Sequence, residues 1–528
     1  MTDPAPLLLV FIALAVFLGG SSVLFALDLD PVWSRVLFWS SATVALAWAL
    51  VRGSRVGVVS ALAVLIAGLA MGLYTYDVSY DGPHYHLPAS LELAQGLNLF
   101  RQPGTLIWTN IYPSGTWRLN AALLASLPLI NPGVVINLAA SVLSGLLLLR
   151  LWRRSGHDLK VLEGLLILGV AFSPVVVAQM LSAMQDGLIA SLFLCLAFLL
   201  AEETLPDGAP PMASRLAAIG IALLMASAKT SGIAFVAAAF GIFGLYALIF
   251  ARTAFKPLFV MGVVAALAFV PINYQPIAGN LQAYGSPIAP SRLAFVNQVP
   301  NDLTDAGRLK KLAIGLFART GGSNCCDEPV EFKFPGTFTI KEIRSADPGP
   351  RTGGFGPMFG ALFLACIALA AIYRPPSSDA VAHRLATAGL GTIVLYLLFP
   401  EPSFARYVPM LAPGVLLLAL GALPRAPRLA LWVVAGIATA NTATFALNAA
   451  SSEYGRLKDI REFRASVPAG SRVLLRENTG KFDYPSYLEL VLRRNGYVPG
   501  AETCEQSAVL LSEQVCVQAT PLFGTPAS

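Results

Sequence analysis

The stretch VGVVSALAVLIAGLAMGLYTYDVSYDGPHYHLP, residues 56–88, joins an apolar run to a compact polar motif. The apolar part, 56–75, carries no charge and is long enough to cross a bilayer as a helix. The motif at 79–88 then holds an aspartate, two of the chain's 4 histidines, two tyrosines and two prolines. The sequence therefore places titratable side chains directly where a helix leaves the membrane.

Apolar runs of similar length recur along most of the chain. Of its 528 residues, 56% are hydrophobic and only 12% are charged, which is about half the charged fraction of an ordinary soluble domain. The pattern predicts an all-α polytopic membrane protein with about 13 transmembrane helices and excludes a soluble helical enzyme. The first run, 6–27, lacks the basic start and cleavage site of a signal peptide, so we expect a retained helix.

The basic residues fall in short clusters between the apolar runs, and the net charge is +6. This is the positive-inside pattern of membrane proteins, and it argues against a nucleic-acid-binding face. Arg52 and Arg55 lie between the second and third runs and place that linker in the cytoplasm. The amino terminus is then cytoplasmic, and the motif at 79–88 lies on the opposite side of the membrane.

Two domains are expected. Residues 1–447 form the transmembrane domain, with extracytoplasmic loops at 76–115 and 273–352. The loop at 76–115 carries spaced leucines that predict an amphipathic helix on the membrane surface. Residues 448–528 are more charged and mix strand-like with helix-like segments, so we expect a small extracytoplasmic α/β domain of about 80 residues.

Four cysteines fall on the side of the membrane where disulfides persist, namely Cys325, Cys326, Cys504 and Cys516. A local Cys504–Cys516 bridge, a strained vicinal Cys325–Cys326 bridge and two pairs between loop and tail all remain open, because spacing does not fix connectivity. The cysteines show neither CxxC nor HxxxH spacing, so we expect no zinc site.

Polar residues that abut the apolar runs collect at one membrane face. Asp81, Asp186, Lys229 and Arg406 all lie at ends of runs on the side opposite to the cytoplasm. A transporter would place several such groups near the middle of the bilayer, so the pattern favours a catalytic site at the interface. A carboxylate can act there as a general base, and cations at the boundary suit a lipid phosphate.

Six stretches, taken in order, resemble a known family. They resemble the signatures of bacterial GT-C glycosyltransferases related to glycosyltransferase family 39. The resemblance covers about 75–450, and its stretches are DGPHYHLP (81–88), SPVVVAQMLSAMQDGLIA (173–190), SAKTSG (227–232), GNLQAYGSPIAP (279–290), GGFGPMF (353–359) and FARYVPMLAP (404–413). One departure is Ser286, which stands where the family usually has the asparagine of a GNP motif.

The resemblance implies an inverting transfer of a sugar from a polyprenyl-phosphate donor to a lipid, glycan or protein acceptor. It implies a multi-pass protein of the bacterial inner membrane, with its active site and carboxyl terminus in the periplasm. The resemblance implies no required cofactor, and it leaves open whether a divalent cation takes part. Asp81 would activate the acceptor hydroxyl and Asp186 would be the second acid. The substrate-binding residues would be His84, Tyr85, His86, Lys229, Arg292, Arg406 and Tyr407.

Each site residue also has a structural interpretation. Asp81 could cap the following helix, and Asp77 is then a second candidate base. Lys229 could merely extend to the interface, and Arg406 could pair with Glu401. Tyrosine and tryptophan side chains near the ends of runs, including Trp108 and Trp117, are typical of an interfacial belt.

Two other functions compete with glycosyl transfer. A flippase or transporter of lipid-linked glycans would need charges spread through the depth of the membrane, whereas these lie at run ends. A ligase or polymerase that uses a diphosphate lipid would need further arginines outside the cytoplasm, and the candidates are Arg292, Arg308, Arg319 and Arg351.

Overall fold

The computed structural model is mainly helical, with one small sheet near the carboxyl end. The expected fold class is confirmed. The residues that it describes are 4–29, 31–77, 79–206, 210–289, 303, 306–321, 330–344, 349, 352–475, 486–500, 506–511 and 513–518.

Eight helices of the described residues are long and apolar enough to cross a membrane. They make the chain a polytopic membrane protein, as its composition predicts. Their bounds are α1 (Ala5–Ala26), α2 (Pro31–Arg52), α3 (Arg55–Tyr74), α7 (Gly133–Arg154), α12 (Thr230–Phe250), α13 (Arg252–Ile272), α20 (Ala380–Leu398) and α22 (Arg428–Ser466).

Five further helices account for the rest of the expected spans. Four are apolar but shorter: α8 (Val161–Ala171), α11 (Met212–Ala228), α19 (Phe359–Ile372) and α21 (Leu411–Ala422). The apolar stretch at 161–180 forms two helices, because Pro174 follows α8 and begins a separate helix. The fifth is α10 (Asp186–Glu203), which carries acidic residues at both ends; its Glu203 pairs with Arg215 at 2.6 Å.

The remaining helices connect these spans and form the loops. They are η1 (Gly82–His86), α4 (Leu87–Ala94), α5 (Ile107–Ile111), α6 (Gly115–Ser126), α9 (Pro174–Gln179), α14 (Tyr274–Tyr284), α17 (Arg308–Phe317), α18 (Ile340–Arg344) and η2 (Ala405–Tyr407).

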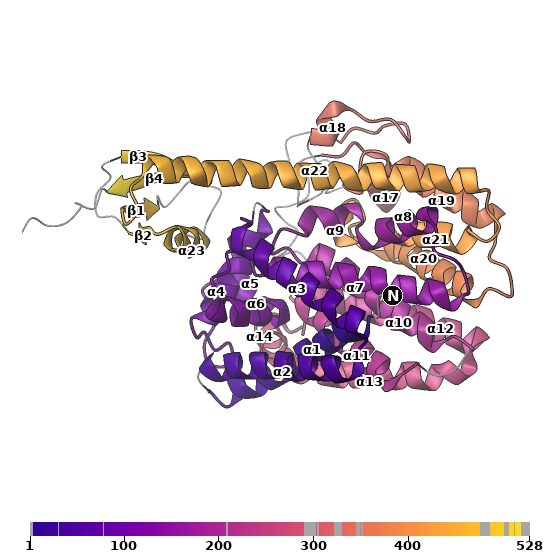
Figure 1. Ribbon diagram of the computed structural model, residues 1–528, viewed down its shortest axis with the longest axis horizontal. Coiled ribbons are helices and arrows are strands. Elements are labelled where there is room, and N and C mark those ends of the chain that lie inside the picture. Colours follow the sequence, from indigo (N-terminus) through magenta and orange to yellow (C-terminus); the bar gives the residue numbers. More distant parts are fainter. Residues whose placement is uncertain are drawn as a thin grey trace, which may run out of the picture.

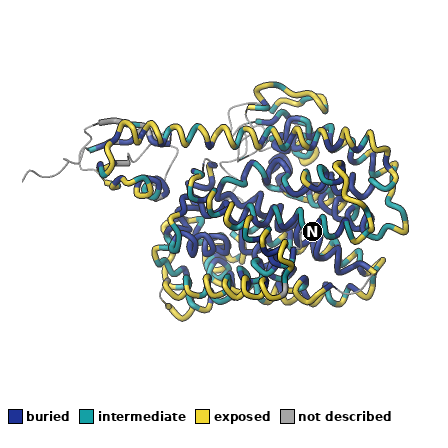
Figure 2. Tube along the Cα trace, viewed as in Figure 1, coloured by how far each residue is buried: buried dark blue, intermediate teal, exposed yellow. Residues whose placement is uncertain are grey.

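The centre of the bundle is built from α7, α10 and α21. Every residue of α10 and of α21 is buried, whereas most residues of α2, α12 and α13 are exposed or half-buried. Figure 2 shows this division, with buried residues inside the bundle and exposed ones along its outer helices. A surface helix that exposes apolar side chains fits contact with lipid, because lipid tails are as apolar as those side chains.

Two expectations for the loop at 76–115 and the short apolar stretch after it are wrong. The helix α4 forms there, but it is not a surface helix, because Ala89 and Ser90 on different sides of it are both fully buried. Trp117 is not a belt residue, because its side chain is fully buried in the same small core as Tyr85 and Leu106. The loop is therefore an inner part of the fold that presents the motif.

The carboxyl-terminal part is carried by one long helix. The 39-residue α22 projects beyond the bundle with the small sheet and α23 (Ser486–Arg494) at its end, as Figure 1 shows. Residue 447, where the sequence places the domain boundary, lies inside this helix. The sheet has the order β2-β1-β4-β3. Its strands are β1 (Arg472–Leu475), β2 (Val498–Pro499), β3 (Gln506–Leu510) and β4 (Glu513–Gln518), with β1 and β2 parallel and the other pairs antiparallel.

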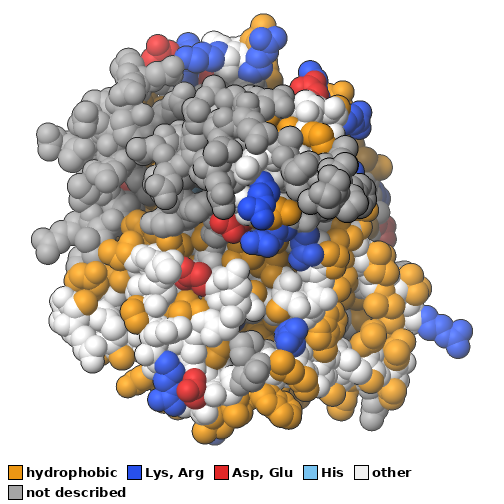
Figure 3. Space-filling model, turned by 90° about the vertical axis from the view of Figure 1, so that its left-hand side faces the viewer, with side chains coloured by type: hydrophobic (Ala, Val, Ile, Leu, Met, Phe, Trp, Pro, Cys, Tyr) orange, Lys and Arg blue, Asp and Glu red, His pale blue; other side chains and the backbone are white. Residues whose placement is uncertain are grey.

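This terminal unit shares a core with the segment that follows α3. Tyr487 and Val491 of α23 belong to one apolar cluster with Tyr76, Leu87 and Ala183. Figure 3 shows the end of the molecule that carries this unit: hydrophobic side chains spread over its lower half, and basic side chains gather above them near the middle. The terminal unit therefore rests directly on the backbone that carries the motif.

Candidate active site

The motif folds as a single π-helical turn, η1, which continues directly into α4. Gly82 is required at its start, because a side chain there would collide with the Asp77 carboxylate. Pro83 suits the first turn of a helix, where no backbone N–H is needed. Asp81 occupies the N-cap position, but its side chain makes no capping hydrogen bond, so the interpretation of Asp81 as a cap is wrong.

Asp81 instead joins a cluster of four charged side chains, of which Lys229 is half-buried and the other three are buried. Its Oδ2 lies 2.9 Å from Nη1 of Arg406, and both side chains are buried. Beside them, Nζ of Lys229 lies 2.6 Å from Oδ1 of Asp186. The Tyr407 ring joins the two pairs, because its centroid is 5.3 Å from the Arg406 guanidinium carbon and 5.7 Å from Lys229 Nζ.

Breaks between helices place these side chains. Asp186 is the first residue of α10, and Lys229 is the single extended residue between α11 and α12. Arg406 and Tyr407 lie in the short η2 turn between α20 and α21. The cluster therefore gathers residues from four distant segments at one end of the central helices. The alternative pairing of Arg406 with Glu401 is wrong: Arg406 faces Asp81, and Glu401 pairs with Lys311 at 2.7 Å.

The charges of the cluster set the state of Asp81. Burial raises the pKa of its carboxyl, but the positive charges of Arg406 and Lys229 outweigh burial and hold that pKa below its usual value. Asp81 is therefore ionised at neutral pH. A carboxylate of this kind can accept a hydrogen bond from a hydroxyl and can stabilise nearby positive charge.

His86 lies next to the cluster as a neutral imidazole. Burial lowers its pKa to about 3. The Trp117 indole N–H donates to His86 Nδ1 at 2.9 Å, and the Gln185 side-chain amide lies 3.2 Å from the same nitrogen. Because Nδ1 accepts, the neutral ring carries its proton on Nε2. His86 is thus prepared to donate one hydrogen bond.

Tyr85 forms the aromatic side of the site. Its ring packs against His86, Trp108 and Tyr112, with centroid distances of 4.1, 5.8 and 6.3 Å. Burial raises the pKa of Tyr85 well above its usual value, so its hydroxyl stays protonated. Aromatic faces of this kind commonly pack against the apolar face of a ligand.

Asp77 has a structural environment rather than a catalytic one. Its Oδ1 accepts from the backbone N–H and the hydroxyl of Ser79 at 2.8 and 2.6 Å. Its Oδ2 accepts from the backbone N–H of Ala183 at 2.6 Å, and its own N–H donates to the Tyr487 hydroxyl at 2.9 Å. Asp77 therefore ties the turn that bears Asp81 to the turn before Asp186 and to the terminal unit.

The other expected residues are not brought into the cluster by any contact described here. The His84 ring stacks on Tyr80 with a centroid distance of 4.0 Å, and its Nδ1 lies 2.5 Å from the Tyr80 carbonyl oxygen. Arg292, Cys325, Cys326 and Cys504 lie outside the described residues. Cys516 lies on β4, where only its backbone is described.

A metal site is not formed by the described part of the chain, since no three His, Cys, Asp or Glu side chains come together there. His86 Nδ1 accepts a hydrogen bond from the Trp117 indole N–H, so the lone pair of this nitrogen is not available to a metal. The charged residues of the cluster are two carboxylates and two cations, and together they carry no net charge.

Trp117, Gln185 and Tyr112 are parts of the site that sequence reasoning did not assign to it. Gln185 precedes Asp186 and lies 2.5 Å from the Thr116 hydroxyl, which places it between the motif and α10. The signal for Trp117 was its neighbour Arg118, because a charged residue inside an apolar stretch indicates that the stretch faces the protein interior.

No protein-family model and no curated protein sequence matches this chain. Two solved structures are similar, both of ArnT from Cupriavidus metallidurans. The structure bound to undecaprenyl phosphate has a TM-score of 0.45 and 14% identity, with 84% of this chain and 85% of that chain covered. The apo structure has a TM-score of 0.44 and 12% identity, with 84% and 89% covered. At these scores the likeness is remote, and the proposals below rest on the residues of the site.

Proposed function

We propose that this protein is an inverting glycosyltransferase that moves a sugar from a polyprenyl-phosphate donor to a hydroxyl acceptor at the membrane interface. The observation that carries the proposal is that two ion pairs, Asp81–Arg406 and Lys229–Asp186, lie together beside the Tyr407 ring. Taking three charges fully and a fourth partly out of water carries a large desolvation cost, and clusters of this kind are therefore candidates for function.

Asp81 directs the acceptor. The acceptor hydroxyl donates a hydrogen bond to the ionised carboxylate, and its oxygen attacks the anomeric carbon of the donor. As the new C–O bond forms, the bond from the anomeric carbon to the phosphate oxygen breaks, and the polyprenyl phosphate leaves with the electron pair. The hydroxyl proton passes to Asp81. The carboxylate also stabilises the positive charge that develops on the sugar ring.

Lys229 and Arg406 are the cations nearest to a leaving phosphate in this proposal. Both already face carboxylates, so a bound phosphate needs at least one more donor or cation. The neutral His86 supplies an Nε2–H donor, and Arg292 is the cation that the motif resemblance implies. Tyr85 and Tyr407 offer aromatic faces to the sugar.

The donor resides in lipid and the acceptor reaches the site from water. This requires a site at the membrane boundary, and the ends of α10, α12 and α21 provide such a boundary for the cluster. From the distribution of basic linkers we place this boundary on the periplasmic side of a bacterial inner membrane, with a cytoplasmic amino terminus.

The experiment that tests the proposal measures donor consumption by the purified full chain. A panel of radiolabelled polyprenyl-phosphate sugars is offered to the wild type, to Asp81→Asn and to Asp158→Asn. Asp158 is an exposed residue of the α7–α8 linker and serves as the matched control. We expect wild type and control to consume one donor, and Asp81→Asn to lose this activity while keeping its fold and its binding of donor.

Two results would contradict the proposal. Equal consumption by the wild type and Asp81→Asn would remove Asp81 from the reaction. Failure of the folded wild type to consume any donor of the panel, in the presence of lipid, glycan and peptide acceptors, would reject a polyprenyl-phosphate sugar as the substrate.

A further inference from the structure

A cavity with mainly apolar walls lies apart from the proposed active site. It has a volume of about 150 Å³ and is lined by α1, α2, α4, α6 and the segments that follow α1 and α4. Apolar side chains such as Phe17, Leu93 and Ala122 line part of it, and Arg35 and Arg118 line another part. Asp81, Asp186, Lys229 and Arg406 are not among its lining residues.

Arg118 is the buried cation of this cavity, with a side chain from α6 that is 2% exposed. Its Nε donates to the Ser114 hydroxyl at 3.0 Å, its Nη1 to the Ser22 hydroxyl at 2.7 Å, and its Nη2 to the Ile272 carbonyl at 3.1 Å. Among the described residues its acceptors are therefore all uncharged. A guanidinium has five N–H donors, so this one retains donors for a further acceptor.

Arg35 adds a second guanidinium from α2. Its Nη1 lies 3.5 Å from the carbonyl oxygen of Ala125, which is again an uncharged group. Among the lining residues, Asp28 is the one carboxylate, and it is exposed. It accepts a hydrogen bond from the Asn98 side-chain amide at 2.8 Å and pairs with Arg101 at 3.7 Å. The cavity therefore has an excess of positive charge.

Two other deeply buried cations of the described structure face a carboxylate: Arg406 faces Asp81, and Lys333 faces Glu342. A third, Arg384, donates to the Thr204 hydroxyl and to the Ala380 carbonyl, and it lies outside this cavity. A buried charge without a counter-ion is costly, and an anion in the cavity would relieve this cost. The chemistry of the walls, partly apolar and partly guanidinium, fits an amphiphile with an anionic headgroup.

The place of the cavity in the fold identifies the source of that anion. Ser21 is near the end of α1 and Arg35 near the start of α2, so the cavity lies at one end of two helices that can cross the membrane. Arginines at that level meet lipid phosphates. Val36 and Trp39 of α2 are exposed and offer an apolar path for an acyl chain.

We propose that this cavity binds the phosphate of an anionic membrane lipid, held by Arg118 and Arg35 with its acyl chains along α2. The volume admits a phosphate and its glycerol but not the chains, which therefore remain in the bilayer. This site is independent of the glycosyl-transfer proposal. Its test therefore needs no enzyme assay.

The test uses native mass spectrometry of the purified full chain, titrated in detergent with phosphatidylglycerol and, separately, with phosphatidylcholine. The variants are Arg118→Gln and Arg35→Gln, and the matched control is Arg55→Gln, an exposed arginine at the start of α3. We expect one tightly retained phosphatidylglycerol in the wild type and in the control. Each cavity variant weakens this retention about tenfold or more, because a charge-assisted contact is lost.

Arg35→Gln decides the outcome where Arg118→Gln does not fold, because Arg35 is only half buried. Retention that is equal in wild type and Arg35→Gln would overturn the proposal. Equal retention of phosphatidylcholine would also overturn it. A further arm adds inorganic phosphate alone; if this ion displaces the lipid at millimolar concentration, the cavity is a site for a free anion and not for a lipid.

Discussion

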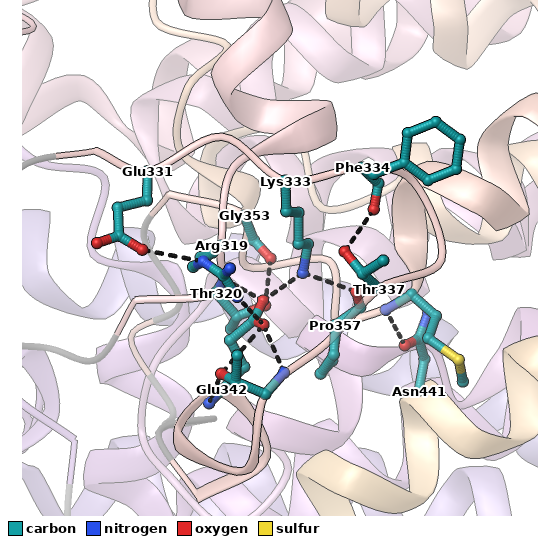
Figure 4. Close-up of polar contacts among 12 residues, drawn as sticks. Arg319, Thr320, Glu331, Lys333, Phe334, Thr337, Glu342, Gly353, Pro357 and Asn441 are labelled. Carbon is teal, nitrogen blue, oxygen red and sulfur yellow. Dashed lines mark hydrogen bonds and ion pairs between the residues drawn. The ribbon is translucent and has the colours of Figure 1, made fainter.

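Two buried carboxylates of this molecule, Glu342 and Asp81, are held in different ways. Figure 4 shows Glu342 at the centre of contacts from its own loop, with Lys333 and Arg319 beside it. The backbone N–H groups of Thr320 and Thr339 donate to Glu342 at 3.0 and 2.9 Å. Its oxygens are therefore satisfied by the loop that they organise.

Asp81 is held by side chains from distant segments instead. Within the described part of the chain no backbone N–H donates to its carboxylate, which faces Arg406 from the α20–α21 turn. Backbone donors fix a carboxylate in a local fold, whereas a pairing between distant side chains leaves the carboxylate able to exchange partners. The difference separates a structural cluster from one that is suited to chemistry, and the predictions below test that separation.

The largest expected effect comes from Arg406→Gln. Without this cation, the effect of burial is less opposed and the pKa of Asp81 rises, so a smaller fraction of its carboxyl is ionised at a given pH. We expect kcat/KM at pH 7 to fall by about 10² to 10⁴-fold and to recover as pH rises through the new pKa. A pH profile from about 6 to 9 measures this. A loss that does not depend on pH would show that Arg406 does not act through Asp81, and Arg493→Gln, at an exposed position of α23, is the control.

Glu342→Gln is expected to change stability and not chemistry. The substitution leaves Lys333, whose side chain is 4% exposed, without its carboxylate, which costs about 3–5 kcal/mol. The thermal unfolding midpoint in detergent should fall clearly, while donor consumption per folded molecule stays unchanged. Glu331→Gln is the matched control, because Glu331 pairs with Arg319 but is 67% exposed and should contribute less than about 1 kcal/mol.

Asp77 accepts hydrogen bonds from backbone N–H groups, as Glu342 does, and lies beside the motif that carries Asp81. We expect the titration of Asp77 to change the stability of the fold. Burial raises the pKa of Asp77 to about 6, so the folded state binds its proton more tightly than the unfolded state does. The contribution of Asp77 to stability is then greatest below about pH 4 and is lost as pH rises through 6. Relative to Asp77→Asn, the wild type should lose up to about 3 kcal/mol of unfolding free energy between pH 4 and 7. If the difference in unfolding free energy between the two proteins stays constant over this pH range, the pKa of Asp77 is not raised.

The smallest expected effect is that of Trp117→Phe. The variant keeps the buried ring but removes the N–H that fixes the tautomer of His86. The loss of one such hydrogen bond is worth about 1 kcal/mol, so we expect about a fivefold fall in kcat with KM little changed. The matched control is Trp39→Phe, in which the indole of the exposed Trp39 on α2 loses its hydrogen bond to Ser126 of α6. Equal effects of the two variants would separate His86 from the reaction.

The sequence predicts which residues gather, but not how they pair. Asp81, Asp186, Lys229 and Arg406 lie at ends of apolar runs, and the alternation of runs across a membrane places those ends on one face. Pairing depends on side-chain direction within short turns, which no periodicity reports. Glu401 illustrates this, because it follows its run as Arg406 does and yet pairs with Lys311 at 2.7 Å.

The loop at 76–115 marks the other limit of sequence reasoning. Its spaced leucines fit a surface helix, but α4 packs against α6 on one side and against α23 of the terminal unit on another, so both faces are buried. Trp117 looked like a belt residue because it begins a short apolar stretch. Only the tertiary packing shows that this stretch, α6, lies inside the protein and directs Trp117 to His86.

One experiment tests the central claim most directly: single-turnover donor consumption by Asp81→Asn and Glu342→Gln, prepared side by side and corrected for the folded fraction. We predict that Asp81→Asn is folded and at least about a hundredfold slower than the wild type, and that Glu342→Gln is less stable but turns over at the wild-type rate. A normal rate for Asp81→Asn together with a slow rate for Glu342→Gln would contradict the assignment of the active site to the cluster around Tyr407.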